Sequence, residues 1–316
     1  MENINILFLG GAKRVSLAEH FIKSGEKLNK KINIFSYELN EKVPLSIIGK
    51  IIKGLKWEDP KILNHLIENI KRYNINIVLP FVDASIEICA KLKRINPQTY
   101  IPVSEESICK IMYEKKLAAQ WFEKQLIPTP KTYNSLNIKF PVILKPNTGS
   151  ASKGLIIIKN SQELLNINNI DNYLIQEYFP INEEYTVDAF VSQNKEIISI
   201  VPRVRLETSG GEVTRSITIN DSNIIQLSKQ ILEKGNFKGP ITIQFIKNRE
   251  TNKLYVMEIN PRLGGGVILS IASGADITKM IIKEFLNLPL QICDDWKIGT
   301  YMTRYFKEVI FYADNN

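Results

Sequence analysis

The 316-residue sequence predicts an α/β domain in its first hundred residues and a larger α+β region after it. Strand-like apolar runs alternate with helical patterns over residues 4–103, which is typical of a parallel sheet covered by helices. Residues 104–140 change to helix and then loop. From Phe140 onward, β-branched runs separated by short turns dominate, so a second architecture is expected there.

In the first region, each strand is expected to lead into a helix. Gly10 and Gly11 follow the first strand, but they do not form a GxGxxG motif, so a structural tight turn is a better interpretation than a nucleotide site. The expected strands are 4–9, 32–37, 75–81 and 100–103, and the expected helices are 15–25, 62–70 and 84–92.

In the second region, strands outnumber helices. A helix is expected to start at 104–106, and an amphipathic helix runs over 113–126, where Pro128 and Pro130 end it. The expected strands are 141–146, 154–158, 173–178, 184–192, 196–206, 241–247 and 254–259, with helices near 161–166, 223–235 and 275–287.

Composition narrows the function classes. A hydrophobic content of 44% and a charged content of 23% exclude a disordered chain. No apolar run or leader pattern predicts a membrane span or secretion, so we expect a cytoplasmic protein without a membrane partner. Three dispersed cysteines and two histidines do not provide a disulfide framework or a common zinc site. The net charge of +8 favours an anionic partner, but the lysines are scattered, so nucleic acid is not expected.

A loop rich in small residues follows the strand 141–146. Lys145 lies at the end of that strand, and Gly149 and Gly154 bracket the loop. Backbone N–H groups of small residues can approach phosphate oxygens, and a lysine supplies a positive charge. The loop therefore could cover a triphosphate, although an ordinary hairpin with an exposed lysine explains the same pattern.

Polar side chains interrupt a later pair of apolar strands. Gln244 lies on the first strand, Glu258 and Asn260 lie on the second, and residues 247–253 form the turn between them. A hairpin centred near Glu250 places position 244 opposite 257 or 258, so the three side chains share one face. Carboxylate and amide oxygens suit Mg²⁺, whereas the alternative is a polar stripe on an edge hairpin. Arg262 follows at once, where it could hold a transferring phosphoryl group.

These motifs, in this order, resemble the ATP-grasp superfamily. Lys145, the segments 176–178 and 184–188, Gln244 and the segment 257–262 carry the resemblance, which extends over nearly the whole chain. Within the superfamily, the chain looks like the carboxylate–amine ligases similar to one half of the carbamoyl-phosphate synthase large subunit. The resemblance implies a Rossmann-like pre-ATP-grasp domain (1–103) and a two-lobed α+β ATP-grasp domain, with an N-terminal lobe and linker helices (104–190) and a C-terminal lobe (191–316).

The resemblance also assigns roles to individual residues. It implies that Lys115 and Lys145 contact ATP phosphates, and that Glu184 binds the ribose hydroxyls. It further implies two Mg²⁺ ions, with Mn²⁺ as the alternative, bridged by Glu258 and completed by Gln244 and Asn260. The remaining nucleotide contacts that it implies are the phosphate lid, with Ser150, Ser152, Lys153 and Gly154, and the adenine-binding Glu177 and Tyr178.

The sequence also departs from the family's pattern. The loop 149–154 lacks the arginine or extra glycine that many relatives carry, and Gln244 replaces the aspartate of many grasp ligases. No amidotransferase domain and no second synthetase half are present, so synthesis of carbamoyl phosphate by this chain is not expected.

The activity implied is an ATP-dependent ligase. A carboxylate attacks the γ-phosphate to give an acylphosphate and ADP, and an amine or similar nucleophile then displaces phosphate. Lys145 and Arg262 would neutralise the developing charge, and Arg205 could orient the substrate carboxylate, although an ion pair on a lobe surface is an equal alternative. Asp83 and Glu87 could face the cleft and bind the amine, but an exposed first helical turn is the preferred interpretation.

The same motifs also fit a second function. An ATP-binding regulatory or subunit protein without ligase turnover is the alternative function. The expected partners are small-molecule carboxylate and amine substrates, whose identity the sequence does not specify, and a homodimer is the assembly considered.

Overall fold

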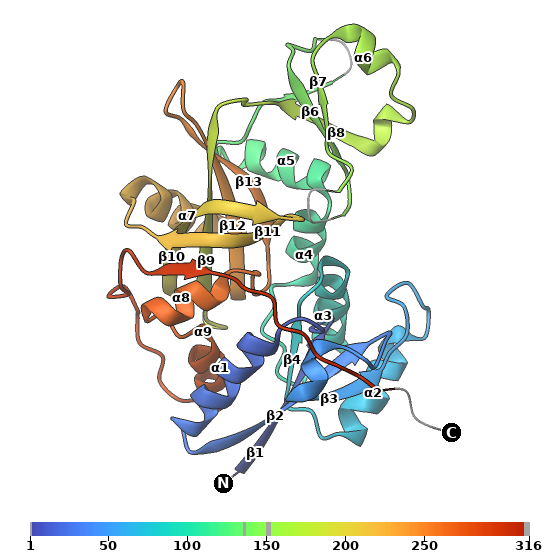
Figure 1. Ribbon diagram of the computed structural model, residues 1–316, viewed down its shortest axis with the longest axis vertical. Helices are drawn as coiled ribbons and strands as arrows, with labels where there is room; N and C mark the ends of the chain where they lie inside the picture. Colours follow the sequence, from blue (N-terminus) through green and yellow to red (C-terminus); the bar gives the residue numbers. More distant parts are fainter. Residues whose placement is uncertain (1, 135–136, 150–152, 313–316) are drawn as a thin grey trace.

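The computed structural model describes residues 2–134, 137–149 and 153–312, which form three sheet-centred units stacked along the long axis of the molecule (Figure 1). A parallel sheet lies at one end, a six-stranded sheet lies in the middle and a smaller sheet lies at the other end. The predicted α/β region followed by an α+β region is confirmed.

The first unit is a parallel sheet of order β3-β2-β1-β4. Its strand β3 was not predicted, because four residues after a short 3₁₀ helix give no clear alternation. The expected strand at 100–103 contributes only a parallel bridge between Tyr100 and Ile77. The elements are β1 (Glu2–Leu9), α1 (Val15–Glu26), β2 (Lys30–Glu38), η1 (Pro44–Ile47), β3 (Lys50–Lys53), α2 (Ile62–Arg72), β4 (Ile77–Pro80) and α3 (Asp83–Ile95).

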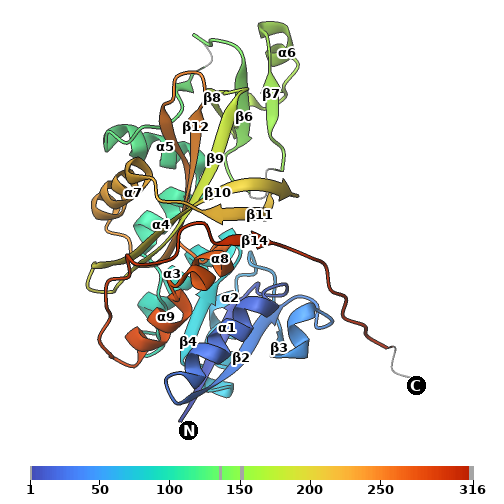
Figure 2. The ribbon, with the colours of Figure 1, turned by 60° about the vertical axis from the view of Figure 1, so that its left-hand side comes forward.

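Helices from both ends of the chain cover this parallel sheet. On one face, Phe8 of β1 and Phe21 of α1 share a core with Ile281, which belongs to α9 (Ile277–Phe285). Helices α1 and α9 lie side by side in Figure 1 and Figure 2. The other face packs against α2 and α3 around Leu66 and Leu92. The first unit is therefore joined to the end of the chain by a common core.

The middle unit is a sheet of order β13-β12-β9-β10-β11-β14. One face packs Val187, Ile243 and Phe245 against helices α4, α5 and α7, and the opposite face is turned towards the cleft described below. The elements are α4 (Glu106–Tyr113), α5 (Lys115–Lys124), β9 (Asn182–Val191), β10 (Ile197–Ser209), β11 (Glu212–Thr218), α7 (Ser222–Gly235), β12 (Gly239–Asn248), β13 (Leu254–Asn260), α8 (Val267–Ser273) and β14 (Tyr301–Thr303).

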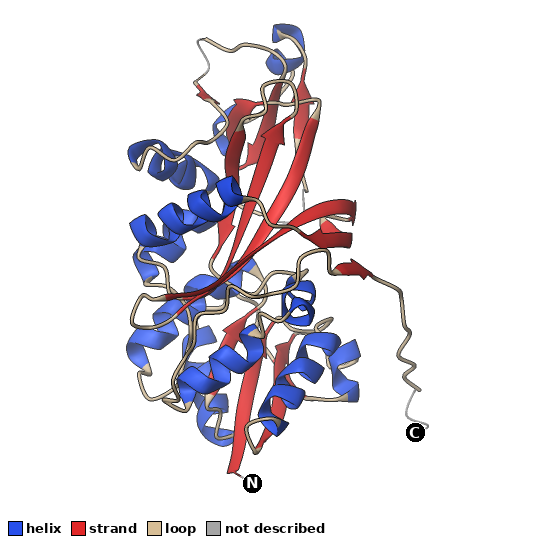
Figure 3. Ribbon diagram, turned by 90° about the vertical axis from the view of Figure 1, so that its left-hand side faces the viewer, coloured by secondary structure: helices blue, strands red, loops and turns tan. Residues whose placement is uncertain are grey.

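The third unit is a small antiparallel sheet of order β5-β8-β6-β7, which projects beyond the middle sheet (Figure 3). Its core holds Val142, Leu144 and Ile175. Its elements are β5 (Thr132–Tyr133), β6 (Val142–Pro146), β7 (Ile156–Ile158), α6 (Ser161–Leu165), η2 (Ile170–Asn172) and β8 (Tyr173–Glu177).

The change from the small to the middle sheet differs from the expected lobe boundary at 190/191. Strand β9 begins at Asn182 and pairs with both β10 and β12, so the middle sheet starts there. The helices assigned to the N-terminal lobe also pack against the middle sheet, through Ile108 and Phe122. Both differences arise because strand pairing and burial, which the sequence does not display, decide which sheet an element joins.

Among the described residues, no helix has the length and apolarity that crossing a membrane requires.

Candidate functional site

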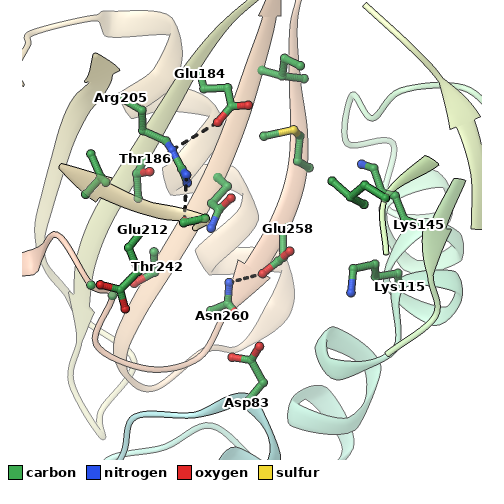
Figure 4. Close-up of a pocket in the computed structure, with 18 of the residues that line it drawn as sticks. Asp83, Lys115, Lys145, Glu184, Thr186, Arg205, Glu212, Thr242, Glu258 and Asn260 are labelled. Carbon is green, nitrogen blue, oxygen red and sulfur yellow. Dashed lines mark hydrogen bonds and ion pairs between the residues drawn. The ribbon is translucent and has the colours of Figure 1, made fainter. Parts of the chain in front are cut away.

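The candidate site is a cavity of about 390 Å³ between the small and middle sheets. Its walls come from all three units, and Arg14 and Asp83 of the first unit line it. Figure 4 shows Asp83 at this edge. The carboxyl ends of parallel strands are where α/β units usually bind ligands, and here that edge meets the cleft.

One wall of the cavity is the β12–β13 hairpin. Gln244 pairs with Glu258 and Thr242 pairs with Asn260, which confirms the predicted register. Asn260 Nδ2 donates a hydrogen bond to Glu258 Oε1 at 2.5 Å, so these two side chains converge as Figure 4 shows. Ile243 is buried on the other face of the sheet. The polar stripe therefore faces the cleft.

The donor atoms of this wall fit a hard cation. The described residues contain no cluster of three or more His, Cys, Asp and Glu side chains that could hold a metal. The hairpin instead offers one carboxylate and two amides, whose oxygen atoms suit Mg²⁺. Since the amide nitrogen of Asn260 already donates to Glu258, its oxygen is the atom that would bind a cation. The single carboxylate of Glu258 neutralises only part of the positive charge of divalent ions. Phosphate oxygens would therefore have to provide the remaining negative charge.

The opposite wall carries two lysines. Lys145 lies on β6 and donates to Gln176 Oε1 at 2.9 Å, and Lys115, the first residue of α5, donates to the carbonyl of Gly149 at 2.8 Å. Burial lowers the pKa of Lys145 to about 8, although Glu258 and Glu184 act to raise it. Figure 4 shows both ammonium groups across the cavity from the Glu258 carboxylate. An anion would fit between these walls if it contacted the two lysines on one side and bound metal cations on the side of Glu258.

The loop after Lys145 contributes Thr148, Gly149 and Lys153 to the lining. Gly154 is not a lining residue, and its φ of +73° explains why glycine is used at this turn. Ser150 and Ser152, which were predicted to form the phosphate lid, lie outside the described residues.

The end of the cavity near β8 brings two separately predicted residues together. Glu177 and Tyr178 line it where β8 ends. Glu184 forms an ion pair with Arg205 at 3.2 Å, and Arg205 also donates to the carbonyl of Gly211 at 3.2 Å. Arg205 therefore lies beside the residue predicted to bind ribose.

Arg262 contacts the first unit. Its Nη2 and Nε lie 2.7 and 2.8 Å from Oδ1 of Asp83, the first residue of α3. The preferred interpretation of an exposed first turn is wrong for Asp83, because α3 begins at the sheet edge that faces the cavity. Glu87, one turn further, is not a lining residue.

A buried ion pair at the wall of the cleft was not predicted, and its arginine, Arg203, lines the cavity. Arg203 Nε donates to Asp188 Oδ2 at 2.8 Å, and Ser270 Oγ donates to the same oxygen. The Arg203 and Asp188 side chains are only 3% and 1% exposed. Gly266 packs against the guanidinium, because a Cβ there would lie 2.6 Å from Arg203 Cζ. The available signal was a pair of opposite charges within two adjoining apolar strands.

A second charged cluster, also missed, lies at the end of the cavity next to Arg262. Arg14 Nη2 lies 3.6 Å from Glu212 Oε1, and Arg304 Nη1 donates to Glu212 Oε2 at 2.8 Å. Arg304 also donates to the carbonyl of Gly265. These residues are far apart in the sequence, so no local pattern connects them.

A family model and two known proteins are similar to this sequence. A protein-family model described as "ATP-grasp in the biosynthetic pathway with Ter operon" matches residues 169–304. A formate-dependent phosphoribosylglycinamide formyltransferase of Prochlorococcus marinus (strain MIT 9301) is 23% identical over 313 residues, which cover 90% of this chain and 76% of the relative. A carbamoyl phosphate synthase large chain of Methanobrevibacter smithii is 23% identical over 254 residues, covering 71% of this chain and 24% of the relative.

The fold matches a solved structure with bound nucleotide. The biotin carboxylase domain dimer of the Hydrogenobacter thermophilus 2-oxoglutarate carboxylase, in complex with MgADP, ADP and bicarbonate, superposes with a TM-score of 0.76 at 15% identity. The match covers 94% of this chain and 73% of that chain. The chain has the ATP-grasp fold, and its residues 169–304 match a family model of that kind. In sequence, it is similar to enzymes named as a formyltransferase and a carbamoyl phosphate synthase.

Proposed function

We propose that this protein is an ATP-dependent ligase that activates a carboxylate as an acylphosphate and joins it to an amine or similar nucleophile, releasing ADP and phosphate. The observation that carries the proposal is the pairing of two walls across one cavity. Lys115 and Lys145 face Glu258 and Asn260 (Figure 4), and Gln244 lines the same wall as the pairing partner of Glu258, so a triphosphate with its metal ions would fit between positive charge and oxygen ligands.

The proposed roles follow from these positions. Lys145 and Lys115 bind the phosphates, Glu177 and Tyr178 contact the adenine, and Glu184 binds the ribose after releasing Arg205. Gln244, Glu258 and Asn260 would hold two Mg²⁺ or Mn²⁺ ions. When bound, such ions polarise the γ-phosphoryl oxygens and neutralise their charge.

Arg262 is the residue best placed to act at the transferring group. Its guanidinium is fixed by Asp83 at two atoms, which sets its orientation before substrate arrives. A positive charge held in this way stabilises negative charge that grows as the carboxylate attacks the γ-phosphate. Arg205 would then act at the nucleotide end of the cleft rather than on the substrate carboxylate, because it lies beside Glu184.

We also propose the partners and the location of the protein. The relatives' names support small-molecule carboxylate and amine substrates, and the dimeric biotin carboxylase domain supports a homodimer. The free thiols of Cys89, Cys109 and Cys293 support a reducing, cytoplasmic location.

The test measures ADP release with Mg²⁺ and panels of acids and amines. Wild type should release ADP only with the correct pair, and product mass should equal the joined substrates minus water. Glu258→Gln removes the only carboxylate of the hairpin set, so turnover should fall by on the order of 10²–10³-fold or more. Glu250→Gln, at the exposed turn of the same hairpin, is the matched control and should leave turnover unchanged.

Two outcomes would contradict the proposal. Wild-type turnover in a folded Glu258→Gln protein would exclude the assigned site. Tight MgATP binding without ADP release, over the whole panel, would instead support a regulatory or subunit protein that retains the ATP-grasp fold.

A further inference from the structure

Arginines gather at the part of the cavity where Arg14 and Arg262 lie. Arg14, from the first unit, lines the cavity, and Arg304, after β14, lies directly behind the lining residues Glu212 and Gly265, to which it donates hydrogen bonds. Arg262 and Arg304 both interact electrostatically with Arg14. Burial lowers the pKa of Arg14, and Arg262 and Arg304 lower it further, while Glu212 opposes them. This end of the cavity thus concentrates guanidinium groups that are partly removed from water.

One carboxylate of the protein itself holds these arginines together. Glu212 Oε1 faces Arg14 and Glu212 Oε2 accepts from Arg304, so its two oxygens bridge two guanidiniums that come from opposite ends of the chain. The burial of Glu212 is outweighed by Arg14 and Arg304, so its pKa is lowered and it stays ionised. A substrate carboxylate or phosphate presents the same paired oxygens.

The bridging carboxylate is the least enclosed member of the cluster. The Glu212 side chain is 48% exposed, whereas those of Arg14 and Arg304 are 18% and 30% exposed. Glu212 directly follows Gly210 and Gly211, both at positive φ, at the tip of the β10–β11 hairpin. The carboxylate can therefore move into water, while Arg304 is held through the carbonyls of Thr214 and Gly265.

We propose that Arg14 and Arg304 form a subsite for an oxyanion of a substrate, a carboxylate or a phosphate group, and that Glu212 occupies this subsite until the substrate displaces it. The subsite deepens the proposed ligase function and rests on it, since it assigns one substrate an anionic group besides the reacting atoms. It is separate from the triphosphate wall, because Lys115 and Lys145 belong to the opposite side of the cavity.

The test measures anion binding to the full-length protein by calorimetry, with Mg²⁺ and a saturating non-hydrolysable ATP analogue filling the γ-phosphate position. The probes are inorganic phosphate and acetate. Arg14→Gln and Arg304→Gln should each weaken binding of the preferred probe about tenfold or more, because each removes a charge-assisted contact. Glu212→Gln should strengthen it severalfold, because the competing carboxylate is gone. The preferred probe identifies the source as phosphate or carboxylate.

A matched pair on the same hairpin provides the controls. Glu207 and Arg215 also form an ion pair, but both side chains are 54% exposed, and neither lines the cavity. Glu207→Gln and Arg215→Gln should therefore leave probe binding unchanged. Thermal melting confirms that every variant is folded, and Arg14→Lys, which keeps the charge, should retain part of the affinity.

Three results would overturn the proposal. They are weaker or unchanged probe binding in Glu212→Gln, wild-type binding in both folded arginine variants, and absence of probe binding to wild type. Binding of the ATP analogue is measured separately. Failure of the analogue to bind would reject the proposed ligase function, and the anion titrations can be repeated without nucleotide to judge the subsite by itself.

Discussion

At the scale of residues, Lys145 carries its charge where burial disfavours it. The pKa of about 8 arises mainly from desolvation, which Glu258 and Glu184 offset only in part. A triphosphate would add the negative charge that the buried ammonium lacks, so its binding should raise this pKa again. At high pH, the neutral Lys145 amine cannot form an ion pair with the phosphates.

We therefore expect the affinity for the ATP analogue to depend on pH. As pH rises through about 8, the Kd should increase by up to about tenfold per pH unit, because the free protein loses the Lys145 proton that the complex requires. Lys145→Arg, which stays protonated, should show a flat profile over this range. Calorimetric titrations from about pH 6.5 to 9.5 measure both. An unchanged slope in the variant would assign the titration to another group.

The lowered pKa of Lys145 also affects the stability of the fold. Stability should rise with pH, whereas the affinity for the ATP analogue should fall. Between about 8 and 10.5, the unfolded chain holds the Lys145 proton more tightly than the native protein does. The contribution of this residue to the free energy of unfolding therefore rises with pH across that interval.

Residue contacts divide into those that the sequence could reveal and those that it could not. Glu258 and Asn260 are two positions apart on one strand, and Gln244 is reached through a short turn, so strand alternation was enough to bring them together. Asp83 and Arg262 are 179 positions apart, and Arg14 and Glu212 belong to different units. No period along the chain encodes such contacts, because they depend on how the sheets stack.

At the scale of elements, α7 packs on the face of the middle sheet that is turned away from the cavity. Its Ile224 and Ile231 share a core with Ile243, on the opposite side from Gln244. Asp221 caps the helix by accepting hydrogen bonds from the backbone N–H groups of Asn223 and Ile224 at 2.9 and 3.2 Å.

Asp221→Ala should therefore lower the free energy of unfolding by about 1 kcal/mol, since two backbone donors lose their acceptor. Urea denaturation measures the change, and Asp221→Asn, which retains an acceptor, should recover most of it. The Kd for the ATP analogue should not change, because α7 does not line the cavity. A weakened Kd in a fully folded protein would indicate coupling between the two faces of the sheet.

The elements that sequence patterns missed are short or polar. Strand β11 has Val213 and Ile217 but otherwise reads as Glu, Thr, Arg and Ser, so its alternation is weak. Helix α8 has seven residues and follows three glycines, without a side-chain cap at its start. Longer elements with strong periodicity, such as α1 and β12, were predicted near their actual positions.

At the scale of the whole molecule, the cavity is built jointly by the three units. A nucleotide bound there contacts the small sheet and the middle sheet at once, so it should stabilise both against unfolding. At about 100 times its Kd, MgADP should raise the free energy of unfolding by about 2.7 kcal/mol.

Urea denaturation with and without MgADP measures this stabilisation. Glu258→Gln should lose most of the part that depends on Mg²⁺, whereas Glu250→Gln should keep it. Equal stabilisation of wild type and Glu258→Gln would show that the metal ligands lie elsewhere.

The core shared by β1, α1 and α9 sets a limit on recombination. Ile6 and Phe21 from the first hundred residues pack with Ile277 and Ile281, which come after most of the chain. A chimera that exchanged residues 1–103 for the corresponding part of a relative would therefore have to exchange α9 as well, because the newly joined surfaces must fit. Residues 1–103 and α9 are thus expected to be inherited together.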